Sequence, residues 1–163
     1  MKKLIPLSLF AVLVSACSTT PQAPIEIDRS DELYLRGSFT WWDAEKDYLV
    51  KKVQDQVYRT TVDLVADGQP YEFRFADEAW STGNNCGYLD KASDETIALD
   101  TPVTGNCLAN YESFLFTPDE SGKYDFYIDF TLDEVKPKIW IKPHQPGLLE
   151  QVVEPINKAL PDL

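Results

Sequence analysis

Apolar and polar residues alternate along several short stretches of this sequence, most clearly over residues 124–130. There the apolar Tyr124, Phe126, Ile128 and Phe130 are separated by Asp125, Tyr127 and Asp129. A period of two places successive side chains on opposite faces of a β-strand, so that one face can be buried. Residues 58–64 show the same pattern, with Tyr58, Thr60, Val62 and Leu64 on one face and Arg59, Thr61 and Asp63 on the other. Both stretches are predicted to be strands.

Four further strands are expected at residues 33–36, 71–76, 112–116 and 135–142. The turn residues Asp67-Gly68-Gln69-Pro70 predict that 58–64 and 71–76 form a hairpin. Pro137 cannot donate a hydrogen bond to a neighbouring strand, which predicts that 135–142 lies at an edge. About seven short strands separated by turns are typical of a β-sandwich. The chain is therefore predicted to be all-β and antiparallel, with its domain at residues 31–143.

The first residues have the pattern of a bacterial export signal. Met1-Lys2-Lys3 precedes the apolar run Leu4–Val14, which is shorter than the roughly 20 residues needed to span a bilayer. The sequence Leu13-Val14-Ser15-Ala16-Cys17 resembles the lipobox of bacterial lipoproteins. This resemblance implies that residues 1–16 are removed and that Cys17 carries lipid, including palmitate. Ser18 after the cysteine implies the outer membrane, on either of its faces. The alternative is an ordinary cleaved signal that contains a cysteine.

Two segments outside the predicted sandwich have a different composition. Residues 17–30 hold prolines and small polar residues, which suit a flexible tether between lipid and domain. Residues 144–163 form a tail that is expected to be partly helical, because its apolar residues have roughly helical spacing: Leu148, Leu149, Val152, Val153, Ile156 and Leu160. The tail either packs on the sandwich or reaches for a partner.

The remaining two cysteines, Cys86 and Cys107, are predicted to form a disulfide. If Cys17 is acylated, they are the pair left in an exported protein, where the compartment is oxidising. The alternative is metal binding, which needs further ligands. His144 is the single histidine of the chain and is a poor candidate for that role.

Several classes of function are excluded or disfavoured by charge and motifs. The net charge of −12 argues against nucleic acid, which is bound through clusters of lysine and arginine. The sequence contains no glycine-rich phosphate loop, nucleophile elbow or zinc-binding helix motif. Its adjacent acidic pairs are expected to form a solvated surface, with calcium at an Asp-rich loop as the alternative. We therefore expect no enzyme, no metal and no cofactor.

The aromatic residues carry the most specific pattern. The stretch Gly37-Ser38-Phe39-Thr40-Trp41-Trp42 is followed by a strand, then by Tyr71-Glu72-Phe73-Arg74 and Asp77-Glu78-Ala79-Trp80. Over residues 32–81 this succession resembles the early-set, immunoglobulin-like modules that bind starch and glycogen, such as family 48 carbohydrate-binding modules and pullulanase or amylase accessory domains. The resemblance implies an immunoglobulin-like sandwich.

The resemblance also implies roles for individual residues. Trp42 and Trp80 match the two sugar-stacking tryptophans, Arg74 takes the place of a lysine between them, and Trp41 adds a second indole. A flat indole can bury the apolar face of a glucose ring at low entropic cost. The alternatives are that Trp42 and Trp80 pack at the sandwich edge and that Arg74 pairs with a neighbouring acid.

Together these features predict an outer-membrane lipoprotein whose non-catalytic sandwich binds α-glucan such as starch, glycogen or maltodextrin. The rival prediction is a structural or protein-interaction lipoprotein of the envelope, with the same fold and a protein partner. An enzyme subunit is a lesser alternative, because related modules usually lie beside a catalytic barrel that this chain lacks.

Overall fold

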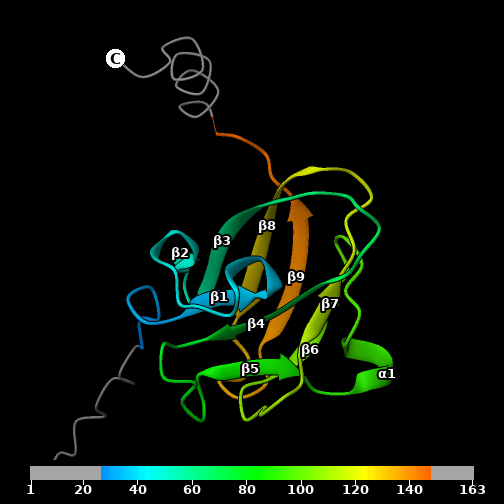
Figure 1. Ribbon diagram of the computed structural model, residues 1–163. Coiled ribbons are helices and arrows are strands. Elements are labelled where there is room, and N and C mark those ends of the chain that lie inside the picture. Colours follow the sequence, from blue (N-terminus) through cyan, green and yellow to red (C-terminus); the bar gives the residue numbers. More distant parts are fainter. Residues whose placement is uncertain (1–26, 148–163) are drawn as a thin grey trace, which may run out of the picture.

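The structure is a computed structural model that describes residues 27–147. This part of the chain is almost entirely β (Figure 1). Its strands are β1 (Tyr34–Gly37), β2 (Lys51–Gln54), β3 (Val57–Leu64), β4 (Tyr71–Ala76), β5 (Asn85–Tyr88), β6 (Val103–Asn106), β7 (Phe114–Phe116), β8 (Gly122–Asp129) and β9 (Lys138–Pro143). Its short helices are η1 (Ser38–Thr40), η2 (Lys46–Tyr48) and α1 (Lys91–Asp94).

The strands form one curled antiparallel sheet that folds over itself. Their order is β1-β4-β5-β6-β9-β8-β3-β2, and β7 pairs with β4 outside this path. Figure 1 shows β1, β4 and β5 crossing in front of β8 and β9, so the sheet closes into two layers. The layers are joined along one side where β5 pairs with β6. The predicted all-β antiparallel sandwich is confirmed.

Aromatic side chains fill the space between the two layers. Phe73 from β4 is fully buried, and its ring lies 5.3 Å from Phe114 and 4.9 Å from Phe126 of the opposite layer. Phe75 is also fully buried, as the alternation on residues 71–76 predicts. Each such side chain contributes roughly 1.5–3 kcal/mol on burial. The core therefore holds β4 rigidly in place, and β4 carries one of the candidate site residues.

The predicted hairpin between residues 58–64 and 71–76 is wrong. β3 pairs with β8 along its whole length, from Val57 opposite Asp129 to Leu64 opposite Gly122. β4 belongs to the other layer, where it pairs with β1, β5 and β7. The connection between β3 and β4 thus crosses from one layer to the other. A short polar turn between two alternating segments is compatible with either connection, so the pattern alone could not separate them.

The predicted edge position of residues 135–142 is also wrong. β9 lies inside the sheet, between β6 and β8. Pro137 precedes the strand, which begins at Lys138, so its missing N–H interrupts no ladder. The Pro137 carbonyl oxygen accepts a hydrogen bond from the Gly105 N–H at 2.8 Å.

The predicted disulfide between Cys86 and Cys107 is confirmed. It connects β5 to the residue that follows β6, and both cysteines are fully buried.

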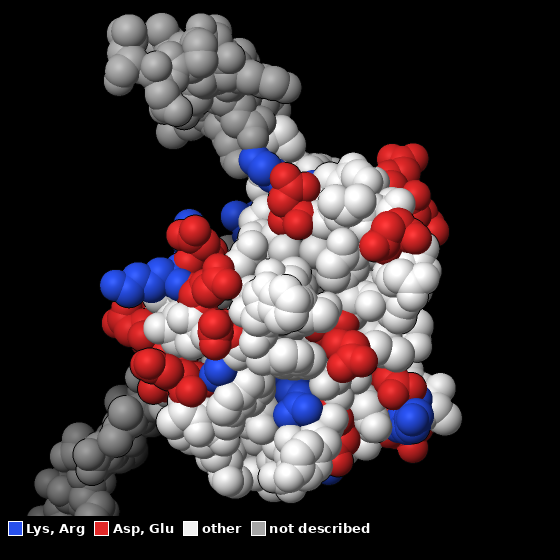
Figure 2. All heavy atoms as spheres, viewed as in Figure 1, with Lys and Arg blue, Asp and Glu red and all other residues white. Residues whose placement is uncertain are grey.

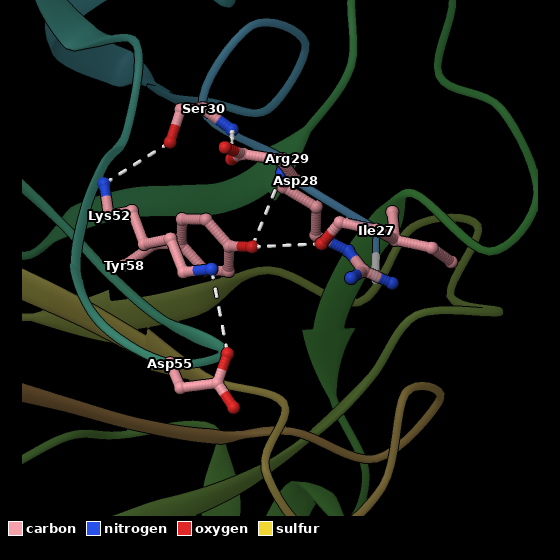
Figure 3. Close-up of polar contacts among 7 residues, drawn as sticks. All are labelled: Ile27, Asp28, Arg29, Ser30, Lys52, Asp55 and Tyr58. Atoms are coloured by element: carbon pink, nitrogen blue, oxygen red, sulfur yellow. Dashed lines mark hydrogen bonds and ion pairs between the residues drawn. The ribbon is translucent and has the colours of Figure 1, made fainter. Parts of the chain in front are cut away.

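Residues at both ends of the described chain contact the sandwich. At the N-terminal end the Tyr58 hydroxyl donates to the Ile27 carbonyl at 3.0 Å, and the Ser30 hydroxyl accepts from the Lys52 N–H at 3.2 Å (Figure 3). At the other end His144 Nδ1 lies 2.8 Å from Oδ1 of Asp125, which is only 3% exposed. Among the described residues, contacts with the sandwich thus include residue 27 at one end and residue 144 at the other.

The predicted export signal, the lipidated Cys17, most of the tether and the helical part of the tail lie outside the described residues. Within residues 27–147 no helix is long and apolar enough to cross a membrane.

Candidate functional site

Trp41 and Trp42 are presented by a tight turn after β1. The Thr40 hydroxyl donates to the Gly37 carbonyl and lies 3.1 Å from the Gly37 N–H, and the Trp42 N–H donates to the same carbonyl at 3.0 Å. A side chain at Gly37 would clash with the Glu72 carbonyl oxygen of β4, so the close approach of the two strands requires glycine. The turn gives Trp41 and Trp42 the left-handed φ values of 52° and 68°.

Trp80 is presented by the connection between β4 and β5. The Asp77 carboxylate accepts from the Ser81 N–H at 2.8 Å and from the Asn84 amide at 3.4 Å, which closes this loop on itself. Burial alone would raise the pKa of Asp77, but the hydrogen bonds from Ser81 and Asn84 outweigh it and lower that pKa. Trp80 also has a left-handed φ, of 58°.

The two tryptophan loops meet, and Arg36 of β1 connects them. The ring centres of Trp42 and Trp80 are 6.2 Å apart, and their planes are inclined by 47°. Arg36 donates to the Trp42 carbonyl at 2.7 Å and to the Asp77 and Glu78 carbonyls at 2.6 and 3.1 Å. Its guanidinium lies 3.8 Å from the centre of the Trp80 ring, within the range of a cation–π contact. One cation therefore fixes both loops and covers one face of Trp80.

Arg74 of β4 lies beside the same rings. Its guanidinium is 5.7 Å from the Trp42 ring centre and 5.6 Å from that of Trp80. Its Nε donates to the Ser113 hydroxyl at 3.1 Å, and its Nη1 donates to the Asn110 carbonyl at 2.7 Å. Among the described residues no carboxylate forms an ion pair with Arg74. Burial lowers its pKa, while nearby Glu112 and Glu72 oppose that shift, and the guanidinium remains charged at neutral pH.

These side chains surround a groove of about 250 Å³, lined by Trp42, Arg74, Trp80, Asn85 and Asn110. Asn85 at the start of β5 is 5% exposed and donates from Nδ2 to the Ala109 carbonyl at 2.9 Å. Its Oδ1 is buried and has no hydrogen-bond partner among the described residues. Figure 2 shows acidic side chains in clusters, mainly toward the two sides of the visible face, with few of them over β4 and β5. The groove thus combines two indoles, one cation and two amides.

The structure brings together three of the four site residues predicted from sequence, namely Trp42, Arg74 and Trp80. Trp41 is adjacent in the chain but is 88% exposed and is not among the residues that line the groove. Sequence reasoning missed Arg36, Asn85 and Asn110. Arg36 alternates with apolar residues like any outward-facing strand residue, and the two asparagines lie outside the recognised motif, so no local signal distinguishes them.

A larger hollow of about 400 Å³ lies on the outer face of β8 and β9, beside Arg59, Tyr127 and Lys142. Its charged groups largely neutralise one another, because Arg59 pairs with Asp125 at 3.3 Å and Lys142 with Asp100 at 3.5 Å. We favour the smaller groove as the functional site because its exposed surface is partly apolar and because no carboxylate within residues 27–147 forms an ion pair with Arg74. Over residues 27–147 no group of three His, Cys, Asp or Glu side chains is placed to hold a metal ion.

The backbone at this groove is strained. Outside glycine, left-handed φ values are uncommon and cost about 1–3 kcal/mol each, and they concentrate at functional sites. Among residues 27–147, five non-glycine residues have a positive φ, and three of them are Trp41, Trp42 and Trp80. Bulky indoles at such positions are held there by the hydrogen bonds of Arg36, Thr40 and Asp77.

We compared the chain with family models, with curated proteins and with solved structures, and the last of these comparisons supports the fold. No protein-family model matches the chain, and no curated protein matches it. The solved structures include a similar chain, described as the ligand-induced structure of AmyP-SBD, a starch-binding domain. The likeness has a TM-score of 0.51 at 17% identity, and it covers 86% of this chain and 97% of that one. At this level of identity the likeness shows a shared fold.

Proposed function

We propose that this chain is a non-catalytic module that binds α-glucan at the groove between Trp42 and Trp80. The observation that carries the proposal is the inclined pair of indoles, 6.2 Å apart and tilted by 47°, with Arg74 beside both rings. The similarity to AmyP-SBD supports it, because that chain is a starch-binding domain with the same fold.

The two indoles suit the apolar faces of sugar rings. Glucose presents C–H groups on its ring faces, and a rigid aromatic side chain covers them with little loss of conformational freedom. Successive rings of an α-1,4 chain are inclined to one another because the chain curves, whereas a flat β-1,4 ribbon stacks on coplanar platforms. The 47° between Trp42 and Trp80 therefore favours a curved α-glucan.

Arg74 supplies the polar part of recognition. Its bonds to Ser113 and Asn110 use Nε and Nη1, which leaves Nη2 without a protein acceptor among the described residues. A sugar hydroxyl in the groove would accept from Nη2, and an unpaired donor in a partly buried site favours a ligand that satisfies it. This arrangement gives orientation and specificity, while the indoles give contact area.

The groove is better suited to binding than to hydrolysis. Most glycoside hydrolases use a pair of carboxylates on either side of the scissile bond. The residues that line the groove are two tryptophans, one arginine and two asparagines, and none of them is acidic. The loops that carry its two tryptophans are also fixed before binding by Arg36 and Asp77, which lowers the entropic cost of association.

The location of the protein is part of the same proposal. We infer that lipid on Cys17 anchors the module in the outer membrane, on the evidence of the Leu13–Cys17 motif. Many copies on one membrane would then hold a polymer by multivalency although each site is weak. Replacement Cys17→Ser is expected to move the protein from the membrane fraction to the soluble fraction of fractionated cells. Unchanged membrane association would argue against the anchor.

Affinity electrophoresis tests the sugar binding. The chain from residue 17, carrying Cys17→Ser, is run in gels with and without glycogen or amylopectin. We expect retardation by the polymer and its loss in Trp42→Ala and in Trp80→Ala. Trp140→Ala is the matched control, because that ring stacks on Tyr127 at 5.0 Å in the other layer. Absence of retardation with any α-glucan would overturn the proposal and leave a protein partner as the better interpretation.

A further inference from the structure

Tyr111 is a large aromatic side chain that is 88% exposed, immediately after the groove residue Asn110. The sequence motifs did not single it out, because it lies in the connection between β6 and β7. Single exposed apolar side chains are common, so exposure alone indicates nothing. What distinguishes Tyr111 is the loop that carries it.

That loop, residues 107–112, is held by contacts to the groove itself. The Ala109 carbonyl accepts from Asn85, and the Asn110 carbonyl accepts from Arg74. Its first residue, Cys107, is joined by the disulfide to Cys86, which is the residue next to Asn85. Asn85 and Arg74 therefore line the groove and also hold the loop in position.

The Glu112 carboxylate fixes the backbone of Asn110 and Tyr111. Its Oε2 accepts from the Asn110 N–H at 2.7 Å and from the Tyr111 N–H at 2.9 Å. These backbone bonds lower the pKa of Glu112, so the carboxylate is charged and binds both amides at neutral pH. The Glu112 backbone also packs so closely on Gly87 that any side chain at Gly87 would clash with the Glu112 carbonyl.

An exposed aromatic ring on a fixed loop is suited to binding. Its backbone is already ordered, and a tyrosine loses few side-chain rotations on contact, so binding has a low entropic cost. A tyrosine also offers an apolar ring together with a hydroxyl that can donate or accept. Both properties match a sugar ring with hydroxyls at its rim.

We propose that Tyr111 is a further glucan-binding residue that extends the groove beyond Asn110. The ligand recognised is then a polymer segment longer than the part covered by Trp42 and Trp80, and short maltosaccharides occupy only the groove. This inference rests on the proposed function, since it assigns a length requirement to the same site. It predicts that the effect of Tyr111 depends on the length of the sugar.

Isothermal titration with maltotriose and with maltoheptaose tests the extension, using the chain from residue 17 with Cys17→Ser throughout. Tyr111→Ala is expected to weaken binding of maltoheptaose about tenfold, as for loss of one aromatic contact, and to change binding of maltotriose less than about twofold. Tyr111→Phe keeps the ring and is expected to retain most of the affinity. Val65→Ala, at an apolar residue 61% exposed in the β3–β4 connection, is the control and is expected to change neither.

Two results would overturn the extension while leaving the proposed function intact. One is unchanged binding of maltoheptaose by Tyr111→Ala alongside clear loss in Trp42→Ala. The other is an equal loss for both sugars, which would mean that Tyr111 acts only by shaping the groove. Failure of the parent protein to bind either sugar or amylopectin would overturn the proposed function, and this extension with it.

Discussion

The guanidinium of Arg36 lies 3.8 Å from the centre of the Trp80 ring and donates to the carbonyl oxygen of Trp42. It thereby connects two loops that are separated by the whole of β2, β3 and β4 in the chain. Arg36 therefore covers one face of the Trp80 ring, and Arg74 lies 5.6 Å from the centre of the same ring. Together with the hydrogen bonds of Thr40 and Asp77, this side chain of Arg36 fixes the relative orientation of the two indoles.

Replacement Arg36→Lys is expected to weaken α-glucan binding about tenfold, which corresponds to about 1.4 kcal/mol, while the chain still folds. Lysine keeps the charge but cannot form the planar fork that reaches the Trp42 and Asp77 carbonyls together. Titration with maltoheptaose measures the affinity, and near-ultraviolet circular dichroism reports the indole environment. Arg59→Lys, at an ion pair in the other layer, is the control. Unchanged affinity and an unchanged indole signal would show that Arg36 does not position the rings.

The disulfide is expected to support both stability and the groove. In Cys86→Ala/Cys107→Ala the free energy of unfolding should fall by about 3 kcal/mol, because the unfolded chain loses a closed loop. Binding should weaken as well, since Asn85 and the 107–112 loop lie on either side of the bond. Urea unfolding and sugar titration measure the two effects. If the double variant keeps both the free energy of unfolding and the sugar affinity of the parent protein, the disulfide supports neither the fold nor the groove.

Two replacements of Trp41 distinguish its effect on the stability of the fold from its effect on sugar binding. Its φ of 52° is strained for an indole, and its ring is 88% exposed, so Trp41→Gly is expected to raise the free energy of unfolding by about 1 kcal/mol. Because the sequence predicts that Trp41 binds sugar, the loss of its ring in the same variant should also lower the affinity for α-glucan. Trp41→Ala removes the ring without relieving the strain and should lower affinity alone. Reduced stability in Trp41→Gly would show that the ring packs against the fold.

Asp77 should make the Trp80 loop sensitive to acid. Its pKa lies below the ordinary value of 3.8, because the hydrogen bonds from Ser81 and Asn84 outweigh the effect of burial. A carboxyl with a lowered folded-state pKa stabilises the fold above pH 3.8, and this contribution is lost as the pH falls through the folded-state pKa. As the pH is lowered through this interval, the free energy of unfolding should fall more steeply in the parent protein than in Asp77→Asn. If the free energy of unfolding has the same pH dependence in both proteins, Asp77 makes no such contribution.

Alternation predicted the buried faces of the sandwich well. Thr60 and Val62 on β3 are buried while Asp63 is exposed. The pairing of the strands was harder to predict, because β3 and β4 belong to different layers although only a short turn separates them. Asp125 shows a second reason for failure. It lies on the predicted polar face but is buried, because Arg59 and His144 pack over it. Contacts between residues distant in the chain leave no mark in a local pattern.

The candidate site was predictable to the extent that it depends on the family-like motif. The Gly37–Trp42 and Asp77–Trp80 stretches predicted Trp42 and Trp80 as site residues, and the structure places both beside Arg74; that they bind sugar stays a prediction. Arg36 and Asn85 were missed because their importance comes from carbonyl groups and neighbours supplied by other strands.

The central claim is that a sugar binds between Trp42 and Trp80, and the indole N–H resonances test it most directly. The chain has four tryptophans, so an ¹⁵N-labelled sample gives four assignable indole signals. On addition of maltoheptaose we expect the signals of Trp42 and Trp80 to shift with saturation, while that of Trp140, stacked on Tyr127 in the other layer, stays unchanged. Unchanged Trp42 and Trp80 signals at saturating sugar, or a shift of Trp140 alone, would contradict the account.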